Sequence, residues 1–575
     1  MRSSAFFYFI FTVLLVALLG SISQHSHALG RKSEENRDIG TSYLLGVKSS
    51  LEKIFQDIDL LSGELDERAV FQAAQNEYEH LQIILFSQGR DLRNVKIEVT
   101  PLICEDQRGA IATDQISLYQ VGYVETKKPA YVVEYIGWWP DPLLPLEQFD
   151  LPSGIVQPIW MTLYVPNETP SGHYRGQVHI IPENARAETL EVDLKIWNFA
   201  LPEKSSLQAV FSLYEHHIQA YFQMDMLSPQ LLRTYYDFLL GHRINPTNLY
   251  LRNQPQPKLQ DFQYCIDHGM NAANICYLYD WDYNEGNKGL FSEEFLKNID
   301  AALPQTISFL EERDWSDIAF IYGPDEPSPR HYDGIKMIFN HVTDLAPNIR
   351  KVLTEPPVKD LYDYVDIWVP KLDEYKEREC RDRQEQGDEI WWYVCLSPQH
   401  PYPNFFIDYP AIDHRILFWM TWKYDITGFL YYTLNRWSTN FQTEDKRWPE
   451  VPWNTFTCEN YNGDGQLIYP GPDGEPYTSL RFEVIRDGIE DYEYLHLLQL
   501  YMERLVSLQT DEKQKHLCRA ENLVRTIDQT VVKSRTKYTK DHQKLLQYRR
   551  LLAEEIVRLK RIVSENSGDD LKEQS

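Results

Sequence analysis

Two adjacent carboxylates stand at the most informative point of the chain. Residues 321–329 read IYGPDEPSP, so Asp325 and Glu326 follow an apolar run at 317–322 and precede a helical pattern at 332–345. These patterns indicate a buried strand followed by a helix. Paired carboxylates at such a strand end suit general acid–base chemistry, because their proximity favours one protonated and one ionised group. The structural alternative is a helix cap or a proline-rich turn.

The elements that must position this pair form a strand–helix repeat between about residues 207 and 437. Short apolar runs alternate there with helical patterns, which is typical of βα units and a parallel sheet. Eight candidate strands predict a TIM-like (β/α)8 barrel. The strands are expected at 209–214, 246–250, 271–279, 318–322, 351–355, 365–372, 390–396 and 428–434.

Different patterns flank the barrel. Alternation of apolar and polar residues at 159–165 and 191–197 predicts an N-terminal antiparallel β-sandwich. Helical patterns after residue 480 predict a C-terminal helical extension, in which Leu545, Leu552 and Leu559 recur at seven-residue spacing. The predicted fold class is therefore multidomain α/β plus β. We expect the sandwich at 42–203, the catalytic barrel at 204–480 and the helical region at 481–575.

The composition of the chain favours some classes of binding partner over others. The 575-residue chain has a formal net charge of -28, which disfavours nucleic acid and anionic membrane surfaces. It also contains 14 Trp and 37 Tyr. An excess of aromatic rings suits carbohydrate binding, because the apolar face of a pyranose packs on a flat ring. Ordinary core filling in a large protein is the alternative.

The amino terminus is typical of a secretory signal peptide at residues 1–28. Arg2 precedes an apolar run at 5–19, and small and polar residues follow up to Ala28. We expect cleavage near Ala28, a secreted or periplasmic protein, and no integral membrane span after cleavage. An uncleaved membrane anchor is the alternative.

Polar and aromatic residues also follow the other predicted strands. His216 and His217 come after the first strand, Tyr279 after the third and Trp437 after the eighth. Carboxylates that face aromatic rings across a barrel mouth have the groups that glycoside hydrolysis needs. Adjacent histidines seldom converge on one ion, so we expect no metal and no other cofactor.

Six segments of the chain resemble glycoside hydrolase family 123. They appear in the expected order, and the resemblance extends from the sandwich through the first C-terminal helix. The segments are residues 322–327, 391–398, 404–410, 415–419, 428–432 and 480–494.

The resemblance implies a retaining β-N-acetylgalactosaminidase whose nucleophile is the acetamido group of the substrate. It makes Asp325 the residue that orients and stabilises that group, and Glu326 the general acid and then the base. The implied substrate is a glycolipid or oligosaccharide that ends in N-acetylgalactosamine (GalNAc). Two alternatives stay open: a related exo-glycosidase with another sugar specificity, and a non-catalytic carbohydrate-binding surface protein.

Six further residues are candidates for substrate binding. Aromatic rings can stack on the sugar, and the acid in the loop at 462–465 can bind a sugar hydroxyl, whereas core packing is the alternative for the rings. The candidates are Tyr393, Trp392, Trp437, Asp464, His216 and Tyr279. The acidic segment 487–493 is instead predicted to anchor the last helix to the barrel.

Overall fold

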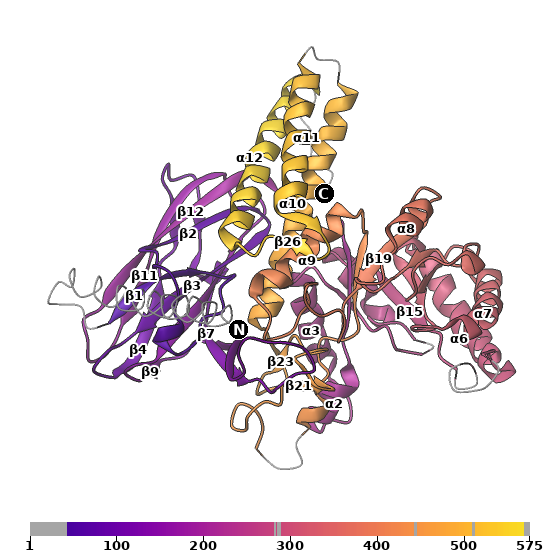
Figure 1. Ribbon diagram of the computed structural model, residues 1–575, viewed down its shortest axis with the longest axis horizontal. Coiled ribbons are helices and arrows are strands. Elements are labelled where there is room, and N and C mark those ends of the chain that lie inside the picture. Colours follow the sequence, from indigo (N-terminus) through magenta and orange to yellow (C-terminus); the bar gives the residue numbers. More distant parts are fainter. Residues whose placement is uncertain are drawn as a thin grey trace, which may run out of the picture.

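The computed structural model describes residues 43–252, 254–280, 283, 289–441, 446–508 and 512–567. A β-sandwich and a barrel lie side by side, and the C-terminal helices pack over the junction between them (Figure 1). This arrangement confirms the predicted fold class. The predicted signal peptide lies outside the described residues, and the domain boundaries stay a prediction. Within the described ranges, every helix is too short or too polar to span a bilayer.

Two sheets form the sandwich, and a shared apolar core lies between them. The first sheet has the order β1 (Leu44–Ser49), β3 (Glu77–Phe86), β10 (Val156–Val165), β7 (Ile116–Glu125), β8 (Trp138–Pro145). The second has the order β2 (Arg68–Gln75), β12 (Glu188–Ala200), β11 (Gly172–Ile181), β4 (Leu92–Val99), β9 (Phe149–Leu151), and the short strands β5 (Leu102–Cys104) and β6 (Ala110–Ile111) extend it. The pairing is antiparallel except between β12 and β2, which run parallel.

Eight parallel strands form the barrel, and each of the eight predicted strands is confirmed. In chain order they are β13 (Gln208–Ser212), β14 (Asn245–Thr247), β15 (Ala273–Tyr277), β16 (Ala319–Tyr322), β17 (Arg350–Leu353), β18 (Ile367–Trp368), β19 (Glu389–Tyr393) and β20 (Gly428–Tyr431). Their side chains alternate between two cores, because successive strand residues point to opposite faces. Phe320, Tyr322 and Trp391 belong to the inner core, whereas Ile321 and Trp392 belong to the outer core beneath the helices.

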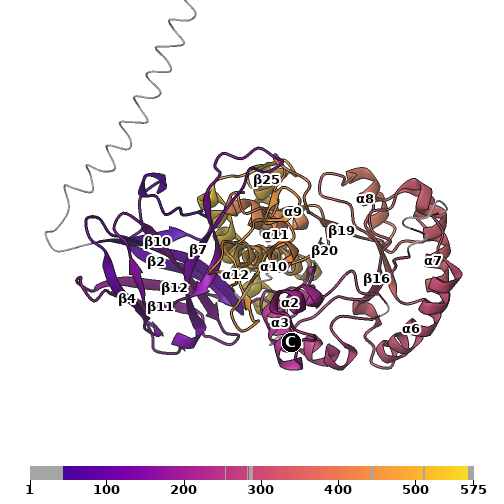
Figure 2. The same ribbon diagram turned by 90° about the horizontal axis from the view of Figure 1, so that it is seen from below.

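Helices surround the strands. Figure 2 shows α6, α7 and α8 outside β16 and β19. The helices of this region are α2 (Glu215–Phe222), α3 (Pro229–Gly241), α4 (Phe262–Asp267), α6 (Glu293–Glu311), α7 (Tyr332–Leu345), α8 (Glu377–Gln384) and α9 (Ala411–Lys423). The short strands β21 (Phe456–Cys458), β22 (Tyr461–Asn462), β23 (Tyr469–Pro470) and β24 (Pro476–Tyr477) lie in the loops after β20.

The barrel sheet begins at β14 and ends at β15, and polar side chains bridge these two strands. Asn274 Nδ2 donates to the carbonyl of Leu249 at 3.0 Å. Asn245 Oδ1 accepts from the backbone N–H of Asn271 at 2.8 Å, and Thr247 Oγ1 accepts from that of Asn274 at 3.1 Å. Buried backbone groups need hydrogen-bond partners. These side chains therefore supply bonds at the seam of the barrel that a strand ladder supplies elsewhere.

The C-terminal region consists of α10 (Leu480–Ser507), α11 (Lys513–Thr530) and α12 (His542–Ser567), with the hairpin β25 (Val532–Ser534) and β26 (Lys537–Tyr538) between the last two. Leu545, Leu552 and Leu559 are fully buried in α12, so their spacing marks the packed face of that helix. Segment 487–493 has the predicted anchoring role, but it lies on α10, the first of these helices rather than the last. Arg415 of α9 binds Asp491 with two hydrogen bonds of 2.6 and 2.8 Å, and Asp487 with one of 2.9 Å.

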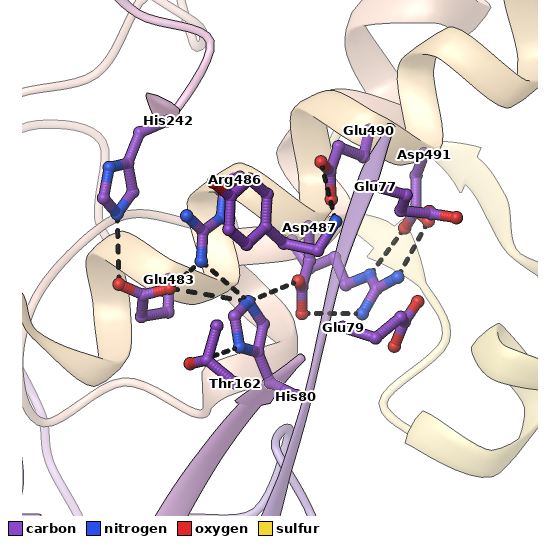
Figure 3. Close-up of polar contacts among 12 residues, drawn as sticks. Glu77, Glu79, His80, Thr162, His242, Glu483, Arg486, Asp487, Glu490 and Asp491 are labelled. Carbon is purple, nitrogen blue, oxygen red and sulfur yellow. Dashed lines mark hydrogen bonds and ion pairs between the residues drawn. The ribbon is translucent and has the colours of Figure 1, made fainter. Parts of the chain in front are cut away.

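The same face of α10 also contacts the sandwich. His80 of β3 lies 3.1 Å from Asp487 and 3.5 Å from Glu483, and Figure 3 shows its ring facing both carboxylates. Arg549 of α12 lies 2.6 Å from Glu79 of β3. Sandwich, barrel and C-terminal helices therefore share one buried network of charged side chains.

Candidate active site

The backbone before the carboxylate pair is held in one conformation. Strand β16 is buried along its whole length and ends at Tyr322. Gly323 follows with φ +98°, and a Cβ at this position would lie 2.9 Å from Cε2 of Tyr277. Glycine is therefore required here, because other residues lack both the space and the favourable φ. The next turn brings Asp325 and Glu326 to the carboxyl ends of the strands, as predicted.

Asp325 is half-buried and accepts three hydroxyl hydrogen bonds. Tyr322 and Thr354 donate to its Oδ1 at 2.5 and 2.9 Å, and Tyr250 donates to its Oδ2 at 3.4 Å. Burial raises the pKa of Asp325, and the nearby Glu326 raises it too, whereas the hydroxyl donors lower it. Burial is the largest effect, so the pKa lies above the ordinary value for an aspartate.

Glu326 is exposed, although it is the direct neighbour of Asp325. Its backbone has φ +42°, in the left-handed region that residues other than glycine seldom adopt. Its N–H donates to Thr354 Oγ1 at 2.8 Å, and its Oε1 accepts from the hydroxyl of Tyr393 at 2.5 Å. Both the backbone and the carboxylate of Glu326 are thus oriented, while the side chain still reaches solvent.

Tyrosine rings surround the pair. The ring of Tyr250 lies 5.2 Å from that of Tyr277, 5.9 Å from that of Tyr322 and 6.1 Å from that of Tyr214. Burial is the main cause that raises the pKa of all four hydroxyls. These groups therefore stay protonated at neutral pH and act as donors. The site combines carboxylates with hydroxyl donors and aromatic faces, which suits a polyhydroxylated ring.

Three of the predicted substrate-binding residues lie at this site. Tyr393 contacts Glu326 as described. The ring of Tyr279 lies 5.8 Å from that of Tyr277, and the guanidinium of Arg252 lies over it at 4.0 Å. His216 stacks on Tyr214 at 5.1 Å, and burial lowers its pKa, so its imidazole is neutral at pH 7.

The predicted roles of Trp392 and Trp437 in sugar binding are wrong for this structure. Trp392 points to the outer core because it alternates with Tyr393 along β19, and its Nε1 donates to Thr421 of α9 at 3.0 Å. Trp437 is fully buried, and its Nε1 donates to the carbonyl of Ile468 at 3.0 Å. Both are core residues, the alternative that the sequence left open.

Asp464 also has a structural role, which corrects its prediction as a sugar ligand. Its carboxylate is fully buried and accepts from the hydroxyls of Tyr432 at 2.8 Å and Tyr431 at 3.4 Å. Burial raises its pKa to about 6. The side chain therefore holds the loop at 462–465 against β20 and presents no group to a ligand.

Thr354, Tyr250 and Tyr322 contact Asp325 but were not among the predicted site residues. The strands β17 and β14 end at Leu353 and Thr247, two and three residues before the predicted ends. Thr354 and Tyr250 therefore lie in the loops at the barrel mouth rather than within strands. A polar residue at the end of a strand was the only signal for Thr354. Within the described residues, no group of three or more His, Cys, Asp or Glu side chains is arranged to hold a metal ion.

Comparisons with known proteins agree with this geometry. Residues 261–498 match the family model "Glycoside hydrolase 123, catalytic domain", and residues 61–181 match "Glycoside hydrolase 123 N-terminal domain". The two matches together cover most of the sandwich, the carboxylate pair and part of α10. Comparison with curated proteins gives no match.

Among solved structures, the fold is similar to that of a family 123 glycoside hydrolase from Clostridium perfringens, which was studied for glycolipid glycan hydrolysis. The TM-score is 0.64 at 15% identity, over 91% of this chain and 98% of the other. A GH5 xyloglucanase from Bacteroides ovatus is much less similar, with a TM-score of 0.27 and 7% identity over 74% of this chain and 98% of the other.

Proposed function

Since the chain belongs to glycoside hydrolase family 123 and is a glycoside hydrolase, we propose that it removes terminal β-linked GalNAc from glycolipids or oligosaccharides with retention of configuration. The observation that carries the proposal is the contrast between two adjacent carboxylates. Asp325 is held by three hydroxyls, whereas Glu326 is exposed and oriented by one. The Clostridium perfringens hydrolase that acts on glycolipid glycans supports the substrate class.

In the proposed first step, the acetamido group of the substrate is the nucleophile. Its N–H donates to Asp325 Oδ2, which accepts only the 3.4 Å bond from Tyr250 among the described residues. The acetamido oxygen attacks C1 while Glu326 gives its proton to the glycosidic oxygen, and the bond from C1 to that oxygen breaks. An oxazolinium ion forms, and the ionised Asp325 stabilises its positive charge.

In the second step, Glu326 acts as the base. It takes a proton from water, the water oxygen attacks C1, and the bond from C1 to the acetamido oxygen breaks. Two inversions at C1 give net retention. Neighbouring carboxylates suffice because the nucleophile belongs to the sugar, whereas an ordinary retaining enzyme needs two carboxyl groups about 5–5.5 Å apart on either side of the bond.

The first test compares three 4-nitrophenyl glycosides: β-GalNAc, β-GlcNAc and β-galactoside, which lacks the acetamido group. We expect turnover of the β-GalNAc compound and none of the β-galactoside. Asp325→Ala should reduce kcat/KM by about a hundredfold or more, because it removes the group that orients the nucleophile. Proton NMR of the first product should show the β-anomer.

Glu326→Gln separates the two roles. A 4-nitrophenolate leaving group needs little protonation, so the variant should lose far more kcat/KM on an alkyl β-GalNAc glycoside than on the nitrophenyl compound. Asp333→Asn, on the exposed first turn of α7, is the control and should leave both rates unchanged. Equal losses on the two aglycones would contradict the acid role of Glu326. No turnover by folded wild-type protein would favour another sugar or a binding protein.

We also propose that the protein is exported, which rests on the signal-peptide pattern of residues 1–28. Cell fractionation and sequencing of the mature N-terminus test this. Export predicts a new N-terminus near residue 29 outside the cytoplasm.

A further inference from the structure

We propose that Thr354 is a positioning residue that couples the two carboxylates through a single hydroxyl group. Its Oγ1 accepts from the N–H of Glu326 at 2.8 Å and donates to Asp325 Oδ1 at 2.9 Å. An N–H can only donate, so the threonine proton is left for the aspartate. Thr354 is only 4% exposed, so water has little access to replace its hydroxyl. The inference rests on the proposed roles of Asp325 and Glu326.

Thr354 occupies the first loop position after β17, the strand next to β16. The two strands are paired through Tyr322 and Val352, and the N–H of Gly323 still donates to the carbonyl of Val352 at 3.1 Å. The hydroxyl of Thr354 continues this connection where the ladder ends. It therefore fixes the carboxylate-bearing turn to a rigid neighbouring strand.

The backbone of Glu326 needs such an anchor. A glutamate at φ +42° is strained, because its Cβ approaches the carbonyl oxygen, and strained residues persist only where the surroundings hold them. The bond to Thr354 fixes the N–H of this residue. Without it, the turn is free to relax towards negative φ, which would move the carboxylate away from Tyr393.

The second bond acts on the charge of Asp325. A hydroxyl that donates to a carboxylate favours the ionised form, and the Thr354 bond lowers the pKa of Asp325 against the effect of burial. The titratable groups that face Asp325 are Glu326 and the hydroxyls of Tyr214, Tyr250, Tyr277, Tyr322 and Tyr393. Burial raises the pKa of each of these tyrosines, so their hydroxyls stay protonated at neutral pH and keep donating.

The test compares Thr354→Val, which keeps the shape but has no hydroxyl, with Thr354→Ser, which keeps the hydroxyl. On a β-GalNAc glycoside, the valine variant should lose about thirtyfold or more in kcat with KM changed by less than about threefold. Its acidic limb of kcat/KM against pH should move to higher pH. The serine variant should stay within about fivefold of wild type and keep the wild-type limb.

A purely structural role predicts a lower melting temperature for both variants with no shift of the acidic limb. An unshifted limb in the valine variant, or a serine variant as slow as the valine variant, would overturn the proposal. A second readout needs no turnover. The valine variant should lose more melting temperature at pH 8 than at pH 4, because the lost bond stabilises the ionised form of Asp325.

The proposed glycosidase activity and the proposed role of Thr354 can be rejected independently. If wild-type protein cleaves no glycoside, the proposed function fails, and the pH dependence of melting alone decides the case for Thr354. Equal losses of melting temperature at pH 4 and pH 8 in the valine variant would then reject the coupling.

Discussion

Replacing Arg415 by methionine should strongly destabilise the protein, and more so at alkaline pH. The guanidinium is 1% exposed and makes three hydrogen bonds of 2.6–2.9 Å to Asp487 and Asp491. Methionine fills similar space but leaves both carboxylates buried without that charge. Breaking a buried ion pair from one side costs about 3–5 kcal/mol. We therefore expect a loss of this size in the free energy of unfolding at pH 8.

The pH dependence follows from Asp487. Burial pushes its pKa up, but the charges of His80 and Arg415 outweigh burial and hold it below the ordinary value. A lowered pKa in the folded state gives stability above the unfolded pKa of about 3.9, and that stability is lost as pH falls through the folded value. Removing Arg415 removes part of this gain, so the penalty should shrink at pH 4.5, where protonation relieves the stranded carboxylate.

Urea unfolding followed by tryptophan fluorescence and circular dichroism at both pH values measures this difference. Arg68→Met is the matched control, because Arg68 is 60% exposed and lies 3.3 Å from Asp193. An exposed pair contributes about 0–1 kcal/mol, so this variant should change little. A loss in Arg415→Met no larger than in the control, or a loss equal at pH 4.5 and pH 8, would show that Arg415 does not stabilise the buried carboxylates.

Three further predictions concern neighbouring parts of the fold. Tyr393→Phe should lower kcat by about tenfold or more, because Glu326 loses the 2.5 Å bond that orients it, whereas Trp392→Phe on the opposite face of β19 should leave kcat within about threefold. Gly488→Ala should cost about 1–3 kcal/mol in urea unfolding, since its Cβ would lie 2.3 Å from Phe418, while Gly241→Ala, which meets no atom within 4 Å, should not destabilise. Burial raises the pKa of Asp413 to about 6. The stability that protonated Asp413 gives the folded state is therefore fully present below the unfolded pKa of about 3.9 and is lost as pH rises through 6. Asp413→Asn should therefore gain stability relative to wild type, by on the order of 2 kcal/mol, between pH 4 and pH 8, and a pH-independent difference in melting temperature would contradict this.

The sequence predicted the barrel well because its signals are local. Buried parallel strands appear as short apolar runs, and the helices between them have a different period. The place of Asp325 and Glu326 followed from the same pattern, because one end of a parallel sheet collects the loops after every strand. Strand ends were less accurate, and a shift of two residues was enough to hide Thr354 within a strand.

The errors at the site have a common origin. When both faces of a strand are buried, apolar residues occupy both, so the run WWY at 391–393 does not reveal which side chains point inward. The loops that carry Trp437 and Asp464 have no period at all, and only their contacts with Ile468 and Tyr432 show that they are structural. The network on α10 was predicted in part. The acids of 487–493 suggested an anchor, but no pattern connected them to His80, some four hundred residues earlier.

The buried charged residues around α10 connect all three parts of the enzyme. Glu79 and His80 come from the sandwich, Arg415 from the barrel and Arg549 from the last helix, and all of them meet α10 or its partners. Deleting any one part would leave buried charged side chains in the other parts without their partners. The sandwich is therefore not a module that can be exchanged for an unrelated domain, and the three parts should unfold together in a single cooperative transition.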